Sequence, residues 1–295
     1  MASLLTSTAA PVTPTPPARD ASEPAVRLRD VVARRGGTPV LRVAHLDLPG
    51  GAVSAVVGPN GSGKSTLLHV VAGLLPGVQG QVRVLGRRPA EVRRRVAYVL
   101  QATAVSSYLP VTVREVVAMG RYAVPSAERT DGSGGRGRGR RARHRAVVDA
   151  AIERLELGGL TRRYLGELSG GQRQRVLVAQ GLAQEGDVLL LDEPVAGLDL
   201  ASAERIAAIV AEERAAGHAV VVATHDLTEA MAADHVALLA GRVVAAGAPG
   251  EVLTRGHLAE AYGDRLLRVG DDLLVVDDGE GHFGGGHCQA PEAAP

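Results

Sequence analysis

The sequence predicts an α/β fold built on a mostly parallel β-sheet. Strand-like and helix-like patterns alternate from about residue 25 to 268, the order expected when helices cover a parallel sheet. Several short runs are almost continuously apolar, which is typical of strands buried on both faces. These runs are 53–57, 96–100, 188–191 and 220–223. The pattern becomes mainly helical before residue 168, so we expect an inserted α-helical subdomain over about 102–180.

A glycine-rich segment follows the run 53–57 and precedes a helix-like apolar pattern. It fits the phosphate-binding P-loop pattern G-x-x-x-x-G-K-[ST] at every fixed position. Its glycines let backbone N–H groups curl around phosphate oxygens, and the helix N-terminus adds partial positive charge. We expect Lys64 to reach the β- and γ-phosphates of ATP and Ser65 to bind Mg²⁺. The expected nucleotide-binding residues of this P-loop NTPase segment are Gly58, Pro59, Asn60, Gly61, Ser62, Gly63, Lys64, Ser65 and Thr66.

Two adjacent carboxylates follow the buried run 188–191. A parallel strand delivers the residues after it to the carboxyl end of the sheet, where ligands bind in such folds. We expect Asp192 to hold Mg²⁺ and Glu193 to act as the general base that polarises the attacking water. The alternative, in which the acids only cap a helix, suits one of them but not both beside Pro194.

A short motif, LSGGQ at residues 168–172, lies between the P-loop and these carboxylates. Ser169 suits a helix N-cap, and Gly170 and Gly171 leave the first backbone N–H groups open to an anion. With these motifs in this order, the chain resembles the ATP-binding subunits of ABC transporters. The resemblance spans nearly the whole chain and implies an N-terminal antiparallel β subdomain. It also implies that Ser169, Gly170, Gly171 and Gln172 bind the γ-phosphate of ATP held by the P-loop of a second copy of the chain.

Three more residues match functional positions of that family. His225, after the run 220–223, falls on the switch histidine that contacts the γ-phosphate. Gln101 falls on the Q-loop glutamine, which senses Mg²⁺ and the attacking water and links the site to the membrane subunits. Asp199 falls on the D-loop aspartate, which works across the dimer interface. The expected catalytic residues are Glu193, His225, Gln101 and Lys64, and the expected Mg²⁺ residues are Ser65, Gln101 and Asp192.

Arg35 departs from the family's pattern. The family usually has an aromatic residue, often Tyr, before a segment like 36–41, and its ring stacks on adenine. A guanidinium plane also stacks on bases, so we expect Arg35 to take this place with weaker purine selectivity.

Composition narrows the possible functions. The chain has 295 residues, 45% of them hydrophobic, enough for one large α/β domain. No stretch approaches the ~20 apolar residues that span a bilayer, so transport would need a separate membrane permease. A net charge of +1 and 2% aromatic residues argue against nucleic acid as a partner. The single cysteine, Cys288, fits a reducing compartment, and residues 1–24 carry no signal-peptide pattern and are expected to form a disordered extension.

Two segments of unusual composition lie outside the motifs. Residues 126–145 are rich in Gly and Arg and predict a flexible basic loop. We interpret it as an insertion tolerated at the surface, with binding of RNA or anionic lipid as the alternative. Residues 269–295 predict a flexible tail. Its His282, His287 and Cys288 are possible ligands for a soft metal, so a metal-sensing tail is a second hypothesis.

Within the family, the segment 109–121 and the surroundings of the LSGGQ motif are similar to ATP-binding subunits of zinc importers. The resemblance implies an ATPase at the cytoplasmic face of the membrane that works with a permease and, indirectly, a solute-binding protein. The expected cargo is a divalent metal ion, zinc first, and an iron-siderophore, haem or manganese importer is the alternative. A third interpretation is an ABC ATPase of DNA repair or translation. Such proteins usually carry two nucleotide domains or a long coiled-coil insertion, and neither is visible here.

Overall fold

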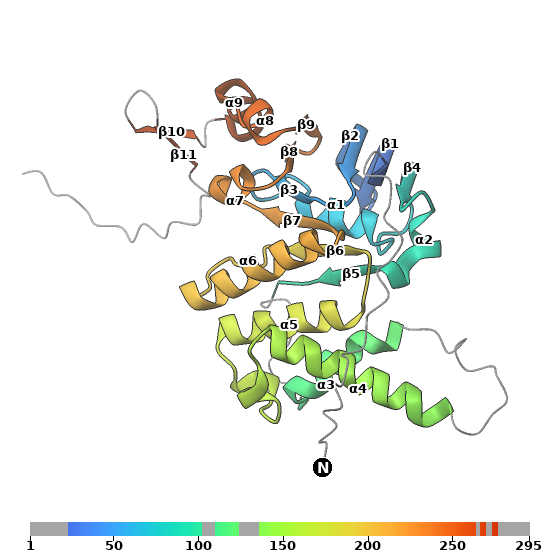
Figure 1. Cartoon of the computed structure of the whole chain (residues 1–295). Coiled ribbons are helices and arrows are strands. Elements are labelled where there is room, and N and C mark those ends of the chain that lie inside the picture. Colours follow the sequence, from blue (N-terminus) through green and yellow to red (C-terminus); the bar gives the residue numbers. More distant parts are fainter. Residues whose placement is uncertain (1–22, 102–109, 124–135, 264–265, 270–272, 277–295) are drawn as a thin grey trace, which may run out of the picture.

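In the described part of the chain, two large β-sheets with the helices that pack on them, and a small sheet of β10 and β11, make up the fold (Figure 1). The computed structural model describes residues 23–101, 110–123, 136–263, 266–269 and 273–276. A six-stranded sheet in the order β5-β6-β7-β3-β8-β9 lies at the centre, and a three-stranded sheet in the order β2-β1-β4 lies beside it. The predicted α/β fold is confirmed.

The central sheet is parallel except at one edge, where β9 runs antiparallel to β8. Strands β6 and β7 are buried along their whole length, as their apolar sequences predict. Because parallel strands share one direction, the carboxyl ends of β3, β5, β6 and β7 meet at the same edge. The strands are β3 (Val53–Val57), β5 (Val96–Val99), β6 (Val188–Asp192), β7 (Ala219–Thr224), β8 (His235–Leu239) and β9 (Val243–Gly247).

The second sheet is antiparallel, as the resemblance implied. It consists of β1 (Pro24–Arg35), β2 (Thr38–Pro49) and β4 (Gln79–Val84), and β1 pairs with both others. Gly36 and Gly37 form the two-residue turn between β1 and β2 with φ of 54° and 84°. Both angles lie in the left-handed region, which glycine adopts without steric strain and which such tight hairpins require.

Helices cover the two faces of the central sheet differently. Side chains of β6 alternate, so that Val188 and Leu190 join one apolar core while Leu189 and Leu191 join another. The first core contains α1 and the antiparallel sheet, and the second contains α3, α4, α5 and α6. Figure 1 likewise has α1 and α5 on opposite sides of the strands β5 and β6. These helices are α1 (Lys64–Val71), α3 (Val113–Met119), α4 (Arg136–Arg154), α5 (Gly170–Ala183) and α6 (Leu200–Ala215).

The remaining elements are short. A third apolar core joins β3 and β8 to the C-terminal helices, and it is centred on residues such as Val57, Leu238 and Leu258. No helix in the described part of the chain is long and apolar enough to cross a membrane. The remaining elements are α2 (Pro89–Val92), η1 (Arg93–Arg95), η3 (Gly120–Ala123), η5 (Gly158–Leu160), η6 (Leu165–Glu167), α7 (Leu227–Met231), α8 (Pro249–Val252), α9 (Arg255–Tyr262), β10 (Leu266–Val269) and β11 (Leu273–Val276).

Two expectations for flexible segments need correction. Helix α4 begins at Arg136, so residues 136–145 of the predicted basic loop are helical, while 126–135 lie outside the described residues. Arginine is a good helix former, and the buried face that starts at Val148 anchors the helix. Residues 273–276 of the predicted tail pair with β10 as a strand, since four consecutive apolar residues favour it. Residues 1–22 and 277–295, including His282, His287 and Cys288, lie outside the description.

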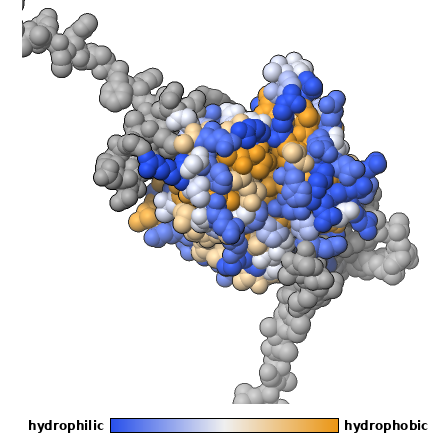
Figure 2. Space-filling model, turned by 90° about the horizontal axis from the view of Figure 1, so that it is seen from above, coloured by the Kyte–Doolittle hydropathy of each residue, from blue (hydrophilic) through white to orange (hydrophobic). Residues whose placement is uncertain are grey.

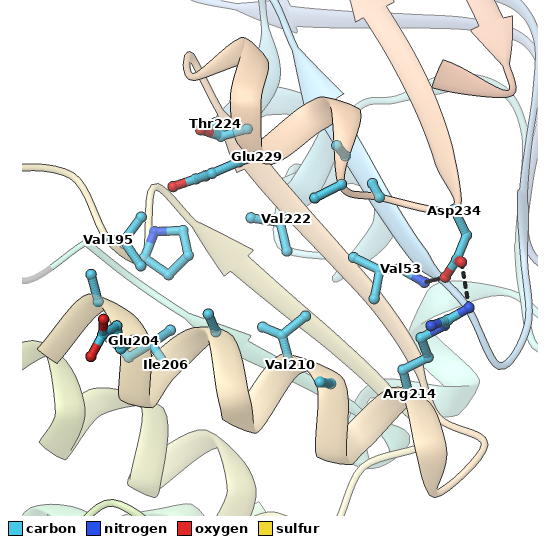
Figure 3. Close-up of a pocket in the computed structure, with 17 residues that line it drawn as sticks. Val53, Val195, Glu204, Ile206, Val210, Arg214, Val222, Thr224, Glu229 and Asp234 are labelled. Carbon is cyan, nitrogen blue, oxygen red and sulfur yellow. Dashed lines mark hydrogen bonds and ion pairs between the residues drawn. The ribbon is translucent and has the colours of Figure 1, made fainter. Parts of the chain in front are cut away.

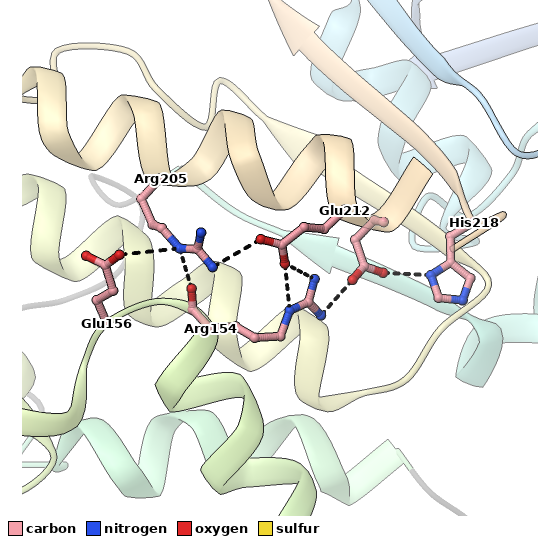
Figure 4. Close-up of polar contacts among 6 residues, drawn as sticks. Arg154, Glu156, Arg205, Glu212 and His218 are labelled. Atoms are coloured by element: carbon pink, nitrogen blue, oxygen red, sulfur yellow. Dashed lines mark hydrogen bonds and ion pairs between the residues drawn. The ribbon is translucent and has the colours of Figure 1, made fainter. Parts of the chain in front are cut away.

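A cluster of charged side chains joins the end of α4 to α6 (Figure 4). Arg154 lies 2.8 Å from Glu212 and 2.7 Å from Glu213, and Glu213 accepts a 2.7 Å hydrogen bond from His218 Nδ1. Arg205 contacts Glu212 at 3.2 Å and donates to the Arg154 carbonyl. The hydrogen bond to Glu213 raises the pKa of His218 above its ordinary value. Burial alone would raise the pKa of Glu213, but the hydrogen bonds from His218 and Arg154 outweigh it and hold that pKa low.

The face seen from above is a mixture of polar and apolar side chains, with apolar patches bordered by polar ones (Figure 2). Large apolar residues that are exposed come from well-separated points of the chain. In the described part they are Leu74, Leu100, Tyr122, Tyr164, Leu200 and Met231.

Candidate nucleotide-binding site

The phosphate loop connects β3 to α1 at the carboxyl end of β3. Gly58, Gly61 and Gly63 have φ of 156°, 82° and 102°, which side-chain-bearing residues rarely adopt. A Cβ atom at Gly58 would lie 2.2 Å from the Leu239 carbonyl oxygen, so only glycine fits where the loop touches β8. Among the described residues, no side chain caps the N-terminus of α1. Within that part of the chain, its first backbone N–H groups therefore donate to no side-chain cap, as the predicted phosphate cradle requires.

Lys64 lies over this loop with only 6% of its surface exposed. Its ammonium donates to the carbonyl oxygens of Gly58 at 2.7 Å and Pro59 at 3.4 Å, and it lies 3.9 Å from Glu193 Oε1. A buried ammonium needs such partners, because desolvating an unpaired charge is costly. The predicted phosphate-binding lysine thus lies between the loop and the predicted general base.

Asp192, which is 9% exposed, ends β6 beside α1. Its Oδ1 accepts a hydrogen bond from Ser65 Oγ at 3.1 Å, and its Oδ2 accepts one from the Tyr98 hydroxyl at 2.9 Å. The predicted metal residues Ser65 and Asp192 are therefore in direct contact. Hydroxyl and carboxylate oxygens are ligands that Mg²⁺ prefers, so this donor set fits the ion.

Glu193 is in contact with three other predicted catalytic residues. Its Oε1 lies 3.9 Å from Lys64 Nζ and 3.9 Å from His225 Nδ1, and its Oε2 accepts a 3.2 Å hydrogen bond from Gln101 Nε2. The backbone at Glu193 has φ of 46°, and its N–H donates to the Ala223 carbonyl of β7 at 2.9 Å. Left-handed backbone is strained for a residue with a side chain and is common at functional sites. It turns the chain sharply at the end of β6, which directs the carboxylate toward Gln101 and His225.

Two residues that sequence reasoning missed, Tyr98 and His69, join this site. The Tyr98 hydroxyl lies 3.1 Å from His69 Nε2, and the rings meet edge to face with centroids 5.3 Å apart. Arg35 Nη2 lies 3.5 Å from His69 Nδ1. Burial, followed by the charge of Asp192, raises the pKa of Tyr98, and burial together with Arg35 lowers that of His69. The signal available in the sequence was the spacing of Ser65 and His69, four residues apart on one helix face.

The LSGGQ segment forms the N-terminus of α5, and Ser169 is its N-cap as predicted. Ser169 Oγ accepts from the Gln172 N–H at 3.2 Å, and Gln172 Oε1 accepts from the Ser169 N–H at 3.2 Å. Asp199 caps the next helix, α6, through a 2.9 Å hydrogen bond from the Ser202 N–H, which lowers the pKa of Asp199. A Cβ atom at Gly171 would lie 2.3 Å from Asp199 Oδ2. These residues therefore form a second group.

The structure thus divides the predicted site residues into two groups. Lys64, Ser65, Gln101, Asp192, Glu193 and His225 belong to the first, and Ser169, Gly170, Gly171, Gln172 and Asp199 to the second. Helices α1 and α5, which carry the P-loop lysine and the LSGGQ residues, pack on opposite faces of β6.

Two cavities lie next to the first group. One, of about 310 Å³, is lined by Glu193, His225 and the half-buried Glu229, whose pKa is raised by burial. The other, of about 440 Å³, lies between α6 and α7 on the face of β3 and β7 (Figure 3). Its lining is mostly apolar, and the Arg214–Asp234 pair, 2.5 Å apart, lies at one end. Since Lys64, Ser65 and Asp192 do not line this second cavity, it is distinct from the phosphate site.

Comparison with known proteins identifies the family. The family model described as "ABC transporter" matches residues 41–196, which include the P-loop, the LSGGQ motif, Asp192 and Glu193. The chain belongs to the ABC transporter family. The resemblance stated from the sequence is confirmed, and this member of the family is an ATPase.

Curated relatives of this ABC transporter subunit belong to several transport systems. The chain is 40% identical to the zinc transport system ATP-binding protein TroB of Treponema pallidum, over 82% of this chain and 88% of the relative. It is 43% identical to the hemin import ATP-binding protein HmuV of Streptomyces coelicolor, over 77% and 79%. It is 35% identical to the manganese transport system ATP-binding protein MntB of Bacillus subtilis, over 87% and 98%.

Solved structures of the ABC family agree with the fold. One is cbiO1 of Clostridium perfringens, part of the transporter complex cbiONQ, with 26% identity, a TM-score of 0.63 and coverage of 81% of this chain and 94% of that one. Another is an ATP-binding cassette of an ABC transporter in its ADP conformation, with 25% identity, a TM-score of 0.65 and coverage of 82% and 99%.

Proposed function

We propose that this chain is the ATP-hydrolysing subunit of an importer for a divalent metal ion, with zinc as the first candidate for the cargo. It acts at the cytoplasmic face of the membrane, bound to a separate permease that receives its cargo from a solute-binding protein. Two copies of the chain bind two ATP molecules between them. The observation that carries the catalytic part of this proposal is the position of Glu193 within reach of Lys64, Gln101 and His225.

Glu193 takes the role of general base in this proposal. Its carboxylate accepts the proton of the attacking water, which adds to the γ-phosphorus while the bond to the bridging oxygen of ADP breaks. Gln101 holds the Glu193 carboxylate from one side through its amide N–H. His225 and Lys64 approach from the other side, where donors to γ-phosphate oxygens stabilise the charge of the transition state.

Ser65 and Asp192, which are in contact, would hold Mg²⁺, and the ion would neutralise charge on the β- and γ-phosphate oxygens. Gln101, whose hydrogen-bond partner is Glu193, stays a predicted metal residue. Lys64 contributes to the same neutralisation from the loop itself. Its present partners, the carbonyl oxygens of Gly58 and Pro59, place the ammonium where phosphate oxygens can replace them as acceptors.

The second copy completes each site. Ser169 and Gln172 cap the N-terminus of α5, and α5 belongs to the apolar core on the face of β6 opposite α1. This arrangement supports contact with the ATP of another copy rather than its own. Asp199, beside Gly171, would lie at the same interface. An anion at the start of α5 is favoured by the helix dipole and by the unobstructed Gly170.

The cargo is inferred from similarity. The relative TroB is named for zinc transport and combines 40% identity with coverage of 82% of this chain, which supports zinc. HmuV covers less of this chain, 77%, and the manganese relative MntB covers more, 87%, but at only 35% identity. Haem is the second candidate, because HmuV is 43% identical, slightly more than TroB at 40%. The residues His282, His287 and Cys288 of the C-terminal tail suit zinc, and they enter this proposal from the sequence alone.

The test is uptake by a strain that lacks the gene. We expect the deletion strain to accumulate radioactive zinc several-fold more slowly, and to grow poorly under zinc chelation until zinc is added. The parent chain should restore uptake, whereas the matched Glu193→Gln chain should not. Normal zinc uptake combined with failure to use haem would replace zinc by haem as the cargo and leave the ATPase role intact.

A further inference from the structure

A chain of hydrogen bonds runs from the end of β1 to the proposed metal site. Arg35 Nη2 lies 3.5 Å from His69 Nδ1, and His69 Nε2 lies 3.1 Å from the Tyr98 hydroxyl. The Tyr98 hydroxyl donates to Asp192 Oδ2 at 2.9 Å, and Asp192 Oδ1 accepts from Ser65 at 3.1 Å. These side chains come from β1, α1, β5 and β6. The series of hydrogen bonds therefore joins the three-stranded sheet, the six-stranded sheet and the helix after the P-loop.

The hydrogen-bond donors in this series all point toward Asp192. A hydroxyl has one hydrogen, and the Tyr98 hydrogen is used on Asp192, so the Tyr98 oxygen must accept from His69 Nε2. A neutral imidazole that donates from Nε2 has its lone pair on Nδ1. Arg35, which has only donors, faces that lone pair. The order of the partners therefore determines one tautomer of His69.

The two oxygens of the Asp192 carboxylate therefore have different partners. Its Oδ2 is engaged by Tyr98, while its Oδ1 faces Ser65, the other residue proposed to hold the metal. Rotation about the last side-chain bond of an aspartate is soft, so an unsupported carboxylate would exchange its two oxygens. A hydrogen bond to the oxygen that does not bind metal removes this freedom, and such outer partners tune metal sites strongly.

We propose that Tyr98, backed by His69 and Arg35, is a positioning residue that holds Asp192 Oδ1 toward Ser65 and the magnesium ion of Mg·ATP. This inference rests on the proposed metal-binding role of Asp192. It also adds to the expected role of Arg35, which was to stack on adenine. Arg35 contacts His69 and, through His69 and Tyr98, supports Asp192. A purely structural alternative is that Tyr98 and His69 only pack their rings together.

The test separates metal affinity from nucleotide affinity in the full chain. Manganese is the probe, and its binding in the presence of ATP is followed by electron paramagnetic resonance in a Glu193→Gln background that slows hydrolysis. Tyr98→Phe keeps the ring and removes the hydroxyl, and we expect it to weaken manganese binding about tenfold. ATP binding in EDTA should stay within about twofold of the parent. The matched control is Tyr122→Phe, whose side chain is 82% exposed, and it should change neither value.

His69 variants test the rest of the chain. His69→Leu removes the donor to Tyr98 and should weaken manganese binding severalfold. His69→Gln can still donate and accept, so it should recover most of the loss. His69→Leu should add little to Tyr98→Phe, because both break the same path. If the losses of manganese affinity from the two changes instead multiply, the two residues act independently and the inference is overturned. The His69 variants also test the inference if Tyr98→Phe does not fold.

The Tyr98→Phe and Asp192→Asn variants decide the question. Unchanged manganese affinity in a folded Tyr98→Phe chain overturns the inference. An equal loss of ATP affinity in EDTA also overturns it, because that is the signature of a general structural role. Asp192→Asn tests the proposed function separately. If it leaves manganese binding unchanged, the metal role of Asp192 is wrong, whereas if it alone weakens binding, that role stands and the inference about Tyr98 fails.

Discussion

Gly171 lies so close to Asp199 that a Cβ atom at position 171 would be 2.3 Å from Asp199 Oδ2 and 2.8 Å from Ser202 Cβ. The start of α5 therefore packs closely against the start of α6. We expect Gly171→Ala to displace Asp199 from its capping position and to lower the free energy of unfolding by about 1 kcal/mol, the usual value of a lost N-cap. Denaturant titration measures it. Gly170→Ala is the matched control, since nothing lies within 4 Å of a Cβ atom there, and equal losses in both variants would refute the steric explanation.

Glu193→Gln is expected to slow ATP hydrolysis about 100-fold or more, because the amide cannot accept the proton of the attacking water. The phosphate contacts of Lys64 and Ser65 remain, so Mg·ATP should convert the protein to a stable dimer. Size-exclusion chromatography and phosphate release measure both effects. Lys64→Ala is the comparison, and it should weaken nucleotide binding itself. A Glu193→Gln protein that stays monomeric and hydrolyses ATP at the parental rate would show that the base is another residue.

Mixing two inactive variants tests whether the site is shared. Ser169→Arg blocks the start of α5, and Lys64→Ala removes the P-loop ammonium. A mixed dimer has one site with both defects and one with neither, so we expect partial recovery of ATPase activity on mixing. Cross-linking or native mass spectrometry must confirm that mixed dimers form. With mixed dimers present, activity no higher than the mean of the two variants argues against the composite site.

The His218–Glu213 pair predicts a pH-dependent stability. The pKa of His218 is raised, chiefly by its hydrogen bond to Glu213, with Asp187 adding attraction and Arg154 opposing it. The stabilisation is therefore fully present below the ordinary histidine pKa of about 6.5 and is lost as pH rises through the higher folded value. We expect His218→Asn to lose about 1 kcal/mol near pH 6 and much less near pH 9.

The control for this pair is His45→Asn. His45 also lies near a carboxylate, 3.6 Å from Asp47, but its side chain is 66% exposed, and such exposed pairs contribute little to stability. Thermal or denaturant unfolding of both variants at several pH values gives the comparison. A loss for His218→Asn that is the same at pH 6 and pH 9 would mean that packing, and not the ion pair, stabilises this part of α6.

The nucleotide motifs could be predicted because each is contiguous in the sequence and carries its own geometry. Glycines at fixed spacing after a buried strand specify a phosphate loop, and Ser169 with Gln172 specifies a capped helix start. The Tyr98–Asp192 contact could not be predicted in this way. It joins residues 94 apart and depends on the register in which Tyr98 of β5 pairs with Leu190 of β6. Periodicity does not give that register.

Helix α4 was missed at its beginning for a related reason. Local composition at residues 136–145 favours a loop, but the buried face at Val148, Ala151 and Ile152 lies farther along the same helix and is packed in the second core. Helical stability comes mainly from such packing, so the helix can extend into a segment whose glycines alone favour a loop. The prediction for Arg35 was incomplete, because its contact with His69 depends on how β1 lies beside α1.

The location of α1 and α5 on opposite faces of β6 has a kinetic consequence for the proposed two-copy enzyme. Each copy carries two different half-sites, so in dilute solution hydrolysis should rise with the square of the protein concentration and become linear only when most copies are paired. A permease that binds two copies would remove this dependence, since it converts their encounter into an intramolecular step with a high effective concentration. The membrane partner would then accelerate ATP turnover without contributing any atom to the chemistry.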